Sequence, residues 1–420
     1  MRPLQNSPLS APEVARVQAR TVRLLMIVEI ITGLGVAMHI SVGALLTQHM
    51  AGTEFSGVGQ SAAVVGGALA AVPASTLMQR HGRRPGLALC YAVGAIGAGI
   101  VLASALTGWV SLLFVGFFLL GTGNAGKFQA RYAAVDLAEP RLRGRHLSMV
   151  VWSTTIGAVV GPNLAGPLGR LIPGVFYLAA PFAFAAFAFL AGAALIVAFL
   201  RPDPLVVAGK QAALPPSREM PSLRETWRAV LASPAARLGI TAMSIGHLVM
   251  VAVMAMTPVH IGETHGEADT MRIVGFVISA HIAGMYGLSP LTGWLTDRVG
   301  RRPVILSGVG LLVAACTIAG TSGHRTEQLT VALVLLGLGW SGTMVAGSTL
   351  FAESMPVPMR ARAQGLSDLA TGLAGAASGL TSGVVVGLSG YNTLTFIAAL
   401  ATVPLIALAL RPASLGSQAA

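Results

Sequence analysis

Twelve apolar runs, each about as long as a membrane-crossing helix, follow one another along this chain of 420 residues. A helix needs roughly 20 mostly apolar residues to cross the hydrocarbon core of a bilayer. The runs lack the two-residue alternation of strands in a membrane barrel, so the pattern predicts an all-α integral membrane protein. The expected spans are 22–46, 57–78, 86–107, 109–132, 147–169, 174–200, 238–261, 272–296, 304–322, 329–352, 363–387 and 391–410.

The composition indicates that lipid surrounds most of the chain. Hydrophobic residues make up 54% of the sequence and charged residues 10%, whereas about a quarter of the residues of a soluble domain are charged. The net charge of +12 is typical of nucleic-acid-binding proteins, but the basic residues fall in small groups between apolar runs and are not interleaved with aromatic residues. We therefore expect neither an enzyme nor a nucleic-acid-binding protein.

The distribution of Lys and Arg predicts the orientation in the membrane. Of the 27 basic residues, 22 lie in the termini and in alternate loops on one side, and three lie in the loops on the other side. The remaining two, Lys127 and Arg131, lie inside the fourth span. Because loops rich in Lys and Arg stay in the cytoplasm, we expect a multi-pass protein of the inner or plasma membrane with both termini cytoplasmic.

Short motifs recur after 216 to 218 residues, which predicts a duplicated six-helix unit. RHGRRP at 80–85 returns as RVGRRP at 298–303, and GTGNAG at 121–126 returns as GLGWSG at 337–342. Repeats of this kind place a substrate site between the two halves. The expected division is a cytoplasmic N-terminal segment at 1–21, a six-helix bundle at 22–200, a cytoplasmic linker at 201–236, a second six-helix bundle at 237–411 and a cytoplasmic tail at 412–420.

The ten residues that begin at Gly293 read GWLTDRVGRR, and they resemble the GxLaDrxGrr signature of the major facilitator superfamily. The first copy of the motif has Gln79 where the aspartate is expected, which leaves the gating role of that copy open. The resemblance implies twelve helices in two pseudo-symmetric bundles, secondary transport by alternating access, and ion pairs that gate the cytoplasmic side. The alternative is that the arginines only anchor the topology. The candidate gating residues are Asp297, Arg298, Gly300, Arg301, Arg302, Arg80, Gly82, Arg83, Asp136 and Glu353.

Two glycine-rich motifs resemble sites of other kinds. GTGNAGKF at 121–128 satisfies GxGxxG and nearly a Walker A motif, but it lies inside an apolar span, and Phe128 replaces the Ser or Thr that would hold magnesium. We interpret its glycines as close helix packing and expect no ATP binding. The segment 157–166 resembles the gxxxGPxxGG element of drug/proton antiporters, although Phe117 stands where those antiporters carry an arginine.

Methionine and histidine side chains in the seventh and eighth spans form a candidate metal site. Met250 and Met254, and likewise His281 and Met285, are four residues apart and share a helix face. Thioethers and imidazole suit Cu(I). The MxxxM and HxxxM motifs also resemble the CcoA-like group of bacterial copper importers, which includes riboflavin importers. The alternative is that Met fills gaps between helices and that His281 hydrogen-bonds to a neighbouring helix.

Titratable and charged groups inside spans are further candidates, because they cost free energy in lipid. Glu29 and His247 are separated by the repeat offset, and our hypothesis is that one or both titrate during transport; the alternative is a structural role. A fixed positive charge at Lys127 or Arg131 favours an anionic or electron-rich organic substrate over a cation. An external loop that either collects metal or is simply solvated contains His260, Glu263, His265, Glu267 and Asp269.

These observations predict a secondary transporter, with copper import through Met250, Met254, His281 and Met285 as the leading hypothesis. The alternative is a small organic substrate, through riboflavin uptake or drug/proton antiport efflux; a non-transporting sensor is a third class. The organic alternative predicts an aromatic-lined cavity, for which 5 Trp, 5 Tyr and 14 Phe are available. We expect the lipid bilayer, a small-molecule or metal-ion substrate and candidate coupling protons as partners, and no cofactor, since copper is expected only as substrate.

Overall fold

The computed structural model describes residues 9–51, 56–171, 178–211, 221–262, 267–323 and 325–411, and these residues are folded almost entirely into helices. No β-strand occurs among them. In chain order the helices are α1 (Ala11–Ala51), α2 (Ser56–His81), α3 (Arg83–Thr107), α4 (Val110–Ala133), η2 (Pro140–Leu142), α5 (Arg143–Leu171), α6 (Ala180–Phe199), α7 (Pro204–Gln211), α8 (Leu223–Ala232), α9 (Pro234–Gly262), α10 (Glu267–Ile282), η3 (Ala283–Gly287), α11 (Ser289–Arg298), α12 (Arg301–Gly320), α13 (Thr326–Ser354), α14 (Val357–Leu400) and α15 (Val403–Leu410).

Eight helical stretches in the described part of the chain are long and apolar enough to cross a membrane. The longest, Val357–Leu410, covers the last two expected spans. Three other expected spans, 22–46, 147–169 and 272–296, correspond to α1, α5 and the succession of α10, η3 and α11. Every span that the hydrophobic pattern predicts therefore has a helical counterpart.

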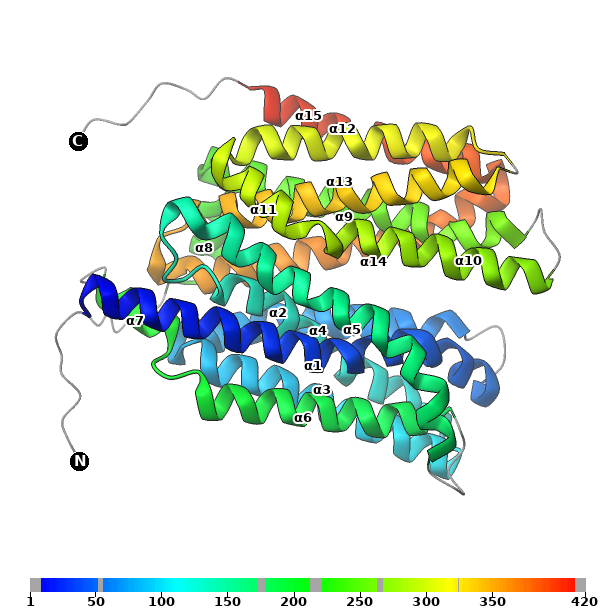
Figure 1. Cartoon of the computed structure of the whole chain (residues 1–420), viewed down its shortest axis with the longest axis horizontal. Coiled ribbons are helices and arrows are strands. Elements are labelled where there is room, and N and C mark those ends of the chain that lie inside the picture. Colours follow the sequence, from blue (N-terminus) through cyan, green and yellow to red (C-terminus); the bar gives the residue numbers. More distant parts are fainter. Residues whose placement is uncertain are drawn as a thin grey trace.

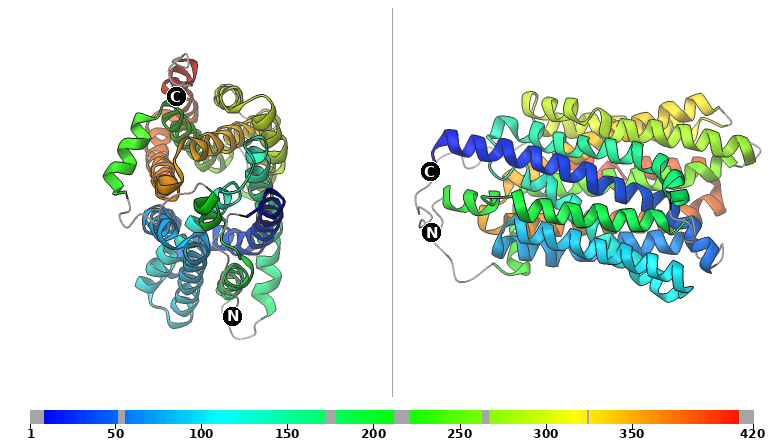
Figure 2. Two further views of the ribbon diagram at one scale, coloured as in Figure 1. Left: turned by 90° about the vertical axis from the view of Figure 1, so that its left-hand side faces the viewer. Right: turned by 60° about the horizontal axis from the view of Figure 1, so that its bottom comes forward.

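The helices form two bundles that lie side by side, α1 to α6 in one and α9 to α15 in the other (Figures 1 and 2). Each bundle has its own hydrophobic core, with Tyr91 and Phe117 in the first and Leu333 and Trp340 in the second. This arrangement confirms the expected fold class of two six-helix halves. The linker is partly helical, because it contains α7 and α8. The first helix, α1, begins at Ala11, within the segment that was expected to precede the first bundle.

Glycines of the repeated motifs allow helices to approach closely within each half. A Cβ atom at Gly121 of α4 would overlap the carbonyl group of Ala63 in α2, and a Cβ atom at Gly337 of α13 would overlap the carbonyl group of His281 in α10. Only a residue without a side chain permits such contact between backbones. These glycines therefore have a packing role at these positions.

Two of the long apolar segments are not regular helices. The π-helix η3 separates α10 from α11 within the expected span 272–296. Gly390, with a φ of 81°, interrupts α14 between the last two expected spans, and glycine adopts this left-handed conformation without a steric penalty. The chain thus changes direction at Gly390 while α14 and α15 continue through both spans.

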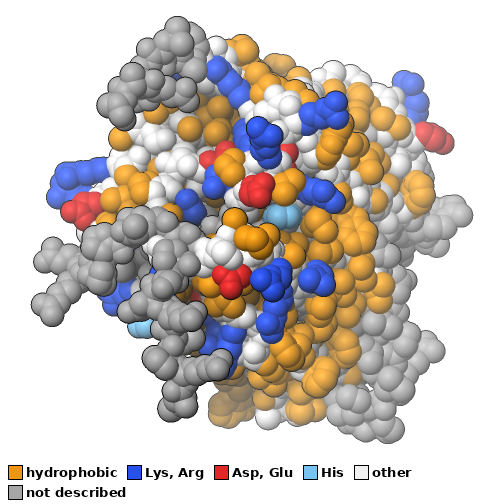
Figure 3. All heavy atoms as spheres, turned by 60° about the vertical axis from the view of Figure 1, so that its left-hand side comes forward, with side chains coloured by type: hydrophobic (Ala, Val, Ile, Leu, Met, Phe, Trp, Pro, Cys, Tyr) orange, Lys and Arg blue, Asp and Glu red, His pale blue; other side chains and the backbone are white. Residues whose placement is uncertain are grey.

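The arginine-rich loops gather at one end of the two bundles, which we call the basic end (Figure 3). They are the α2–α3, α4–α5, α11–α12 and α13–α14 connections. The hydrogen bonds that the structure describes between the halves involve residues at this end or in the middle of the helices, and none joins residues at the opposite end. The described contacts therefore hold the halves together at the basic end.

Candidate functional site

A small cavity lies between the two halves. Its free volume is about 20 Å³, which is room for about one water molecule. Both halves contribute to its wall, as the repeat predicts, so a substrate can enter only if the halves separate on one side. The lining residues are Glu29 of α1, Lys127, Phe128 and Arg131 of α4, Val150, Val151 and Thr154 of α5, Tyr286 of η3, and Trp340 and Met344 of α13.

The charged side chains of this cavity all come from the first half. Glu29 is 1% exposed, and its Oε1 atom accepts a hydrogen bond from the Tyr91 hydroxyl at 3.0 Å. The Lys127 Nζ atom lies 5.4 Å from the centroid of the Tyr286 ring, a distance at which a cation is attracted to an aromatic face. With Arg131, the cavity contains two cations and one carboxylate, and an electron-rich or anionic ligand would complement this charge.

Aromatic rings form the other conspicuous part of the wall. Tyr286 and Trp340 meet edge to face, with their centroids 5.5 Å apart, and the Arg131 guanidinium lies 5.2 Å from the centroid of the Phe128 ring. Counting aromatic residues in the sequence did not reveal this concentration. The internal repeat contained a signal, because Phe128 and Met344 occupy equivalent positions in the two copies of the glycine motif and both line the cavity.

Arg131 connects the cavity to a buried acid that the sequence analysis did not single out. Its Nη2 atom donates to Oδ1 of Asp368 in α14 at 2.7 Å, and its Nη1 atom lies 2.9 Å from the sulfur of Met344. Gln129 of α4 donates to the other Asp368 oxygen, also at 2.7 Å. The Nε atom of Arg131 is buried without a hydrogen-bond partner among the described residues. A donor is thus free beside the cavity.

His247 lies behind the cavity wall. The Nε1 atom of Trp340 donates to His247 Nδ1 at 3.2 Å, and a Cβ atom at Gly375 of α14 would come within 2.6 Å of the His247 ring. Glu29 and His247, which the repeat relates, therefore differ in position: Glu29 lines the cavity, whereas His247 contacts it through Trp340.

The four residues of the candidate copper site lie in the second half, and none of them lines this cavity. Met250 and Met285 are buried in the hydrophobic core, and Met254 packs against the same core. His281 is fully buried, and its Nδ1 atom is 2.8 Å from the carbonyl oxygen of Leu333. Its Nε2 atom has no hydrogen-bond partner among the described residues. No described hydrogen bond joins the histidine to the methionines.

At the basic end, Asp297 reaches from the second half to the first. Its carboxylate accepts hydrogen bonds from the backbone N–H groups of Gly144 and Arg145, both at 2.8 Å. These groups open α5, where a negative charge is favourable because helix N-termini carry partial positive charge. We call this contact the charged latch.

Gln79 makes the equivalent contact from the first half to the second. Its Oε1 atom accepts from the backbone N–H of Ala361 at 2.9 Å, and its Nε2 atom donates to the Val357 carbonyl at 3.2 Å. Ala361 corresponds to Gly144 in the repeat. The aspartate missing from the first copy of the motif is thus replaced by an amide that bridges the first turn of α14. We call this contact the neutral latch.

The arginine four residues after each latch residue forms an ion pair within its own half. Arg83 is completely buried, and its Nε atom lies 2.8 Å from Asp136. Arg301 lies 2.8 Å from Glu353 in a partly exposed pair. Asp136 and Glu353 are both among the candidate gating residues of the sequence analysis.

The remaining motif residues have other contacts. Gly82 and Gly300 have φ values of 94° and 105°, in the left-handed region that favours glycine. The guanidinium of Arg298 lies 5.1 Å from the centroid of the Trp294 ring, and Arg302 donates to the Ala409 carbonyl. Arg80 is exposed on the surface.

Two segments considered in the sequence analysis are described only in part. Residues 263–266 of the loop between α9 and α10, which include Glu263 and His265, lie outside the described residues. In α5, a Cβ atom at Gly157 would come within 2.6 Å of the Gly33 backbone in α1. The first glycine of the antiporter-like segment therefore packs against α1.

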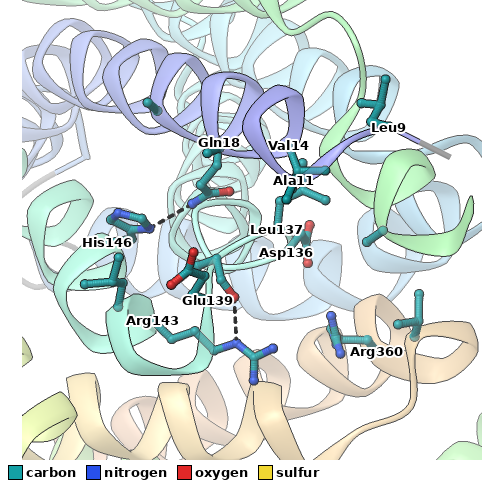
Figure 4. A pocket seen from close by; sticks show the side chains of 16 residues that line it. Leu9, Ala11, Val14, Gln18, Asp136, Leu137, Glu139, Arg143, His146 and Arg360 are labelled. Carbon is teal, nitrogen blue, oxygen red and sulfur yellow. Dashed lines mark hydrogen bonds between the residues drawn. The ribbon is translucent and has the colours of Figure 1, made fainter. Parts of the chain in front are cut away.

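A larger hollow of about 700 Å³ opens at the basic end, where α1, the α4–α5 connection and the start of α14 meet (Figure 4). Gln18 points from α1 toward His146 of α5, with 3.0 Å between Gln18 Nε2 and His146 Nδ1 (Figure 4). Burial lowers the pKa of His146, and the neighbouring charge of Arg145 lowers it further. Residues of both halves line this hollow, so it forms part of the closed basic end.

Comparison with known proteins identifies relatives across nearly the whole chain. The Bacillus subtilis protein named Uncharacterized MFS-type transporter YddS is 39% identical over 396 residues, which are 92% of this chain and 89% of that protein. The riboflavin transporter RfnT of Brucella anthropi is 28% identical over 84% of this chain and 86% of its own length.

Solved structures of transporters share the fold. The Escherichia coli transporter FucP in its outward conformation aligns with a TM-score of 0.69 at 17% identity, over 92% of this chain and 97% of FucP. The human organic anion transporter MFSD10 aligns with a TM-score of 0.71 at 16% identity, over 93% of this chain and 99% of its own. The sequence profile of the Major Facilitator Superfamily matches residues 25–271 and 266–417, and we conclude that this chain belongs to that superfamily of membrane transporters.

Proposed function

We propose that this protein takes up a small, flat organic molecule with electron-rich oxygen or nitrogen atoms, of which riboflavin is the example to test. The observation that carries the proposal is the cavity between the halves. Its wall combines the aromatic rings of Phe128, Tyr286 and Trp340 with the cations Lys127 and Arg131. Rings stack on a flat aromatic ligand, and the cations complement its electron-rich edge. The 28% identity to a riboflavin transporter supports the same substrate class.

We further propose that the basic end faces the cytoplasm of a cell bounded by an inner or plasma membrane. The excess of Lys and Arg at this end supports the assignment. Transport then requires alternating access: the latches release, the cavity opens toward the cytoplasm, and the halves close at the opposite end. Glu29 offsets the charge of one cation of the cavity, and Arg131, although paired with Asp368, keeps an Nε donor without a partner among the described residues for the ligand.

The test measures radiolabelled riboflavin in a riboflavin auxotroph that lacks its own importer. Wild type should restore growth and uptake. Trp340→Leu and Lys127→Ala should each reduce uptake about tenfold, because an aromatic pair contributes roughly 0.5–1.5 kcal/mol beyond its buried area and a desolvated cation–π contact about 2 kcal/mol. Trp109→Leu, at a 66% exposed tryptophan of the opposite end, is the matched control and should transport normally. Absence of riboflavin uptake by well-expressed wild type would exclude this substrate.

Copper import is a second candidate, and one observation favours it. If the Nδ1 atom of His281 donates its proton to the Leu333 carbonyl, the buried Nε2 atom presents a lone pair that no described residue uses. Metal-binding histidines are commonly held in this way, and Met285 follows one turn later. The test is radiocopper uptake by His281→Ala and Met254→Leu, with Met78→Leu in the core of the first half as the control. Copper uptake that survives both site substitutions would end this proposal.

A further inference from the structure

Asp368 is a buried acid whose described side-chain partners belong to the other half. It lies on α14 in the second half, and its two carboxylate oxygens are bound by Arg131 and Gln129 of α4 in the first half. Its side chain is 2% exposed and that of Arg131 is 4% exposed. The pair is therefore a buried ionic contact across the surface along which the two halves must separate.

Two other acids, Glu29 and Glu353, could also bind a proton, but their contacts differ from those of Asp368. Glu29 accepts its hydrogen bond from Tyr91 within the first half, so that bond is not lost when the halves part. Glu353 does meet Arg143 across the halves at 3.4 Å, but both side chains are more than 20% exposed, and partly exposed pairs contribute little. A proton can shift a conformational equilibrium only if it binds the two states differently. Asp368 has that property because its partners are lost when the halves part.

The cavity connects a ligand to this pair. Arg131 lines the cavity, and its Nε atom has no hydrogen-bond partner in the described part of the chain. An electron-rich ligand atom therefore has a donor to bind and competes with Asp368 for the guanidinium. If the ligand displaces Asp368 from the guanidinium, Asp368 becomes a buried carboxylate without its counter-charge, which is strongly unfavourable. Uptake of a proton from water relieves that cost, because it converts the carboxylate to a neutral carboxylic acid.

We propose that Asp368 is the proton-binding site of the transport cycle and that a ligand in the cavity loads it by taking Arg131 away. This inference rests on the proposed function, because it names the coupling ion of the same site. In the unloaded state, the ionised Asp368 holds the basic end closed through Arg131 and Gln129. In the loaded state, the neutral Asp368 releases α4, and the basic end opens. Ligand and proton therefore cross together.

Gln129 extends the effect of Asp368 toward the basic end. Its amide donates to Asp368, and its Oε1 atom accepts from Arg83 at 2.9 Å. Arg83 in turn donates to Gln364 of α14 at 2.5 Å. Loss of charge at Asp368 thus loosens a continuous series of bonds between α14 and the first half. The charged or titratable groups around Asp368 are Arg131 and Tyr132 of α4, Arg83 of α3, and, around Arg131, His247 of α9 and Glu29 of α1.

The first test needs no substrate. Spin labels at His81→Cys and Val299→Cys, two exposed positions on the two halves at the basic end, report the distance between the halves in purified protein; the native Cys90 and Cys316 are buried. Acidification from mildly alkaline to mildly acidic pH should raise the ratio of open to closed protein about tenfold, within the usual range of coupling between sites. Asp368→Asn should be mostly open at every pH, whereas Glu29→Gln should retain the pH response.

Two further variants keep the test decisive. One serves if Asp368→Asn misfolds, and the other removes a hydrogen-bond partner of Asp368. Asp368→Glu keeps an ionisable group and should retain a pH response with a displaced midpoint, so it serves if Asp368→Asn is not stably folded. Gln129→Leu, in a protein that keeps Asp368, removes one hydrogen-bond donor to the Asp368 carboxylate. It should shift the pH midpoint of opening without abolishing the pH response. Two results would overturn the proposal. One is a distance distribution in wild type that does not change with pH, and the other is an Asp368→Asn protein that responds to pH like wild type.

The second test uses riboflavin in proteoliposomes. Asp368→Asn should lose accumulation driven by a proton gradient about tenfold or more, yet retain exchange of internal for external riboflavin, since exchange moves no net proton. Loss of both activities in a folded variant would contradict the proposal, because it would indicate a role in binding. If wild type exchanges no riboflavin, the proposed substrate fails, while the spin-label measurement still decides the role of Asp368.

Discussion

The charged latch and the neutral latch occupy equivalent places in the two halves and use different chemistry. Asp297 bonds two backbone N–H groups at the first turn of α5 as an anion, whereas Gln79 bonds one N–H and one carbonyl at the first turn of α14 as a neutral amide. Hydrogen bonds to charged groups contribute about 1.5–3 kcal/mol, and neutral ones about 0.5–1.5 kcal/mol. The duplication has therefore preserved the geometry of the contact but not its strength.

This difference indicates that the two latches at the basic end need not open at the same time. The weaker neutral latch lies beside α14, the helix that carries Asp368, and Arg83 adjoins it. The stronger latch lies at α5 and α11, beside Arg301 and Glu353. We expect α2 and α14 to separate first and α5 and α11 to separate last. Spin-label pairs at Glu139 and Val299, and at His81 and Pro356, would follow the two latches separately.

Among the substitutions at the latches, Asp297→Asn should have the largest effect on opening at the basic end. The substitution removes the negative charge from two hydrogen bonds at a helix N-terminus, so the ratio of open to closed protein at the charged latch should rise about tenfold or more. The distance between labels at Glu139 and Val299 measures it. Glu225→Gln is the control, because Glu225 of α8 accepts hydrogen bonds only from Ser222 among the described residues. An unchanged closed distance in the variant would show that the charge is dispensable.

Gly144→Ala should weaken the same latch almost as much. An added Cβ atom would lie 2.7 Å from the Gly293 carbonyl oxygen and 2.9 Å from Asp297, and such overpacking typically costs about 1–3 kcal/mol. Opening should therefore increase about tenfold, measured with the Glu139 and Val299 labels. Ala361→Gly is the matched control at the equivalent position, where it should leave the charged latch closed. Normal closure in Gly144→Ala would mean that the latch tolerates a side chain there.

Gln79→Leu should have a smaller effect, confined to the neutral latch. The variant loses two neutral hydrogen bonds, so opening between α2 and α14 should rise about fivefold. Labels at His81 and Pro356 should report the change, while those at Glu139 and Val299 stay near the wild-type distance. Equal opening at both label pairs would refute the idea that the latches release separately.

His146 should give the smallest effect, through the pH dependence of stability. Its pKa in the folded protein is lowered by burial and by Arg145, so the folded state binds this proton less readily than the unfolded state. Stability associated with neutral His146 is present above the ordinary histidine pKa and is lost as pH falls through that range. In His146→Gln, the acid-induced fall in Tm should shrink by about one or two degrees. An identical pH profile would assign no role to this histidine, whose counterpart beside the neutral latch is Ala363.

The sequence predicted the fold well because lipid imposes strict rules on the pattern. Apolar runs of helical length and asymmetric arginines allow few other arrangements, and the repeat located the bundles. The π-helix at η3 was not predicted, because 272–296 reads as one uninterrupted apolar span. Its geometry depends on packing between helices, which a hydrophobic pattern does not specify.

The candidate site was predicted only in part. Lys127, Arg131 and Glu29 stood out as charges within apolar spans, and all three line the cavity. Asp368 escaped notice although it lies within the expected span 363–387. Its partner Arg131 is 237 positions away, so the pair exists only in three dimensions. Trp340 and Tyr286 escaped because single aromatic residues are common in apolar helices and only their meeting forms a wall.

The π-helix η3 also determines how α11, which follows it, is rotated about the helix axis. A π turn accommodates one residue more than an α turn, and one residue corresponds to about 100° of rotation around a helix axis. α11, and with it Asp297, is therefore turned by roughly that angle relative to a regular continuation of α10. The equivalent stretch of α2 is regular helix, so Gln79 has no such offset. Removing one residue from η3 would leave the composition of the cavity nearly unchanged yet point Asp297 away from α5.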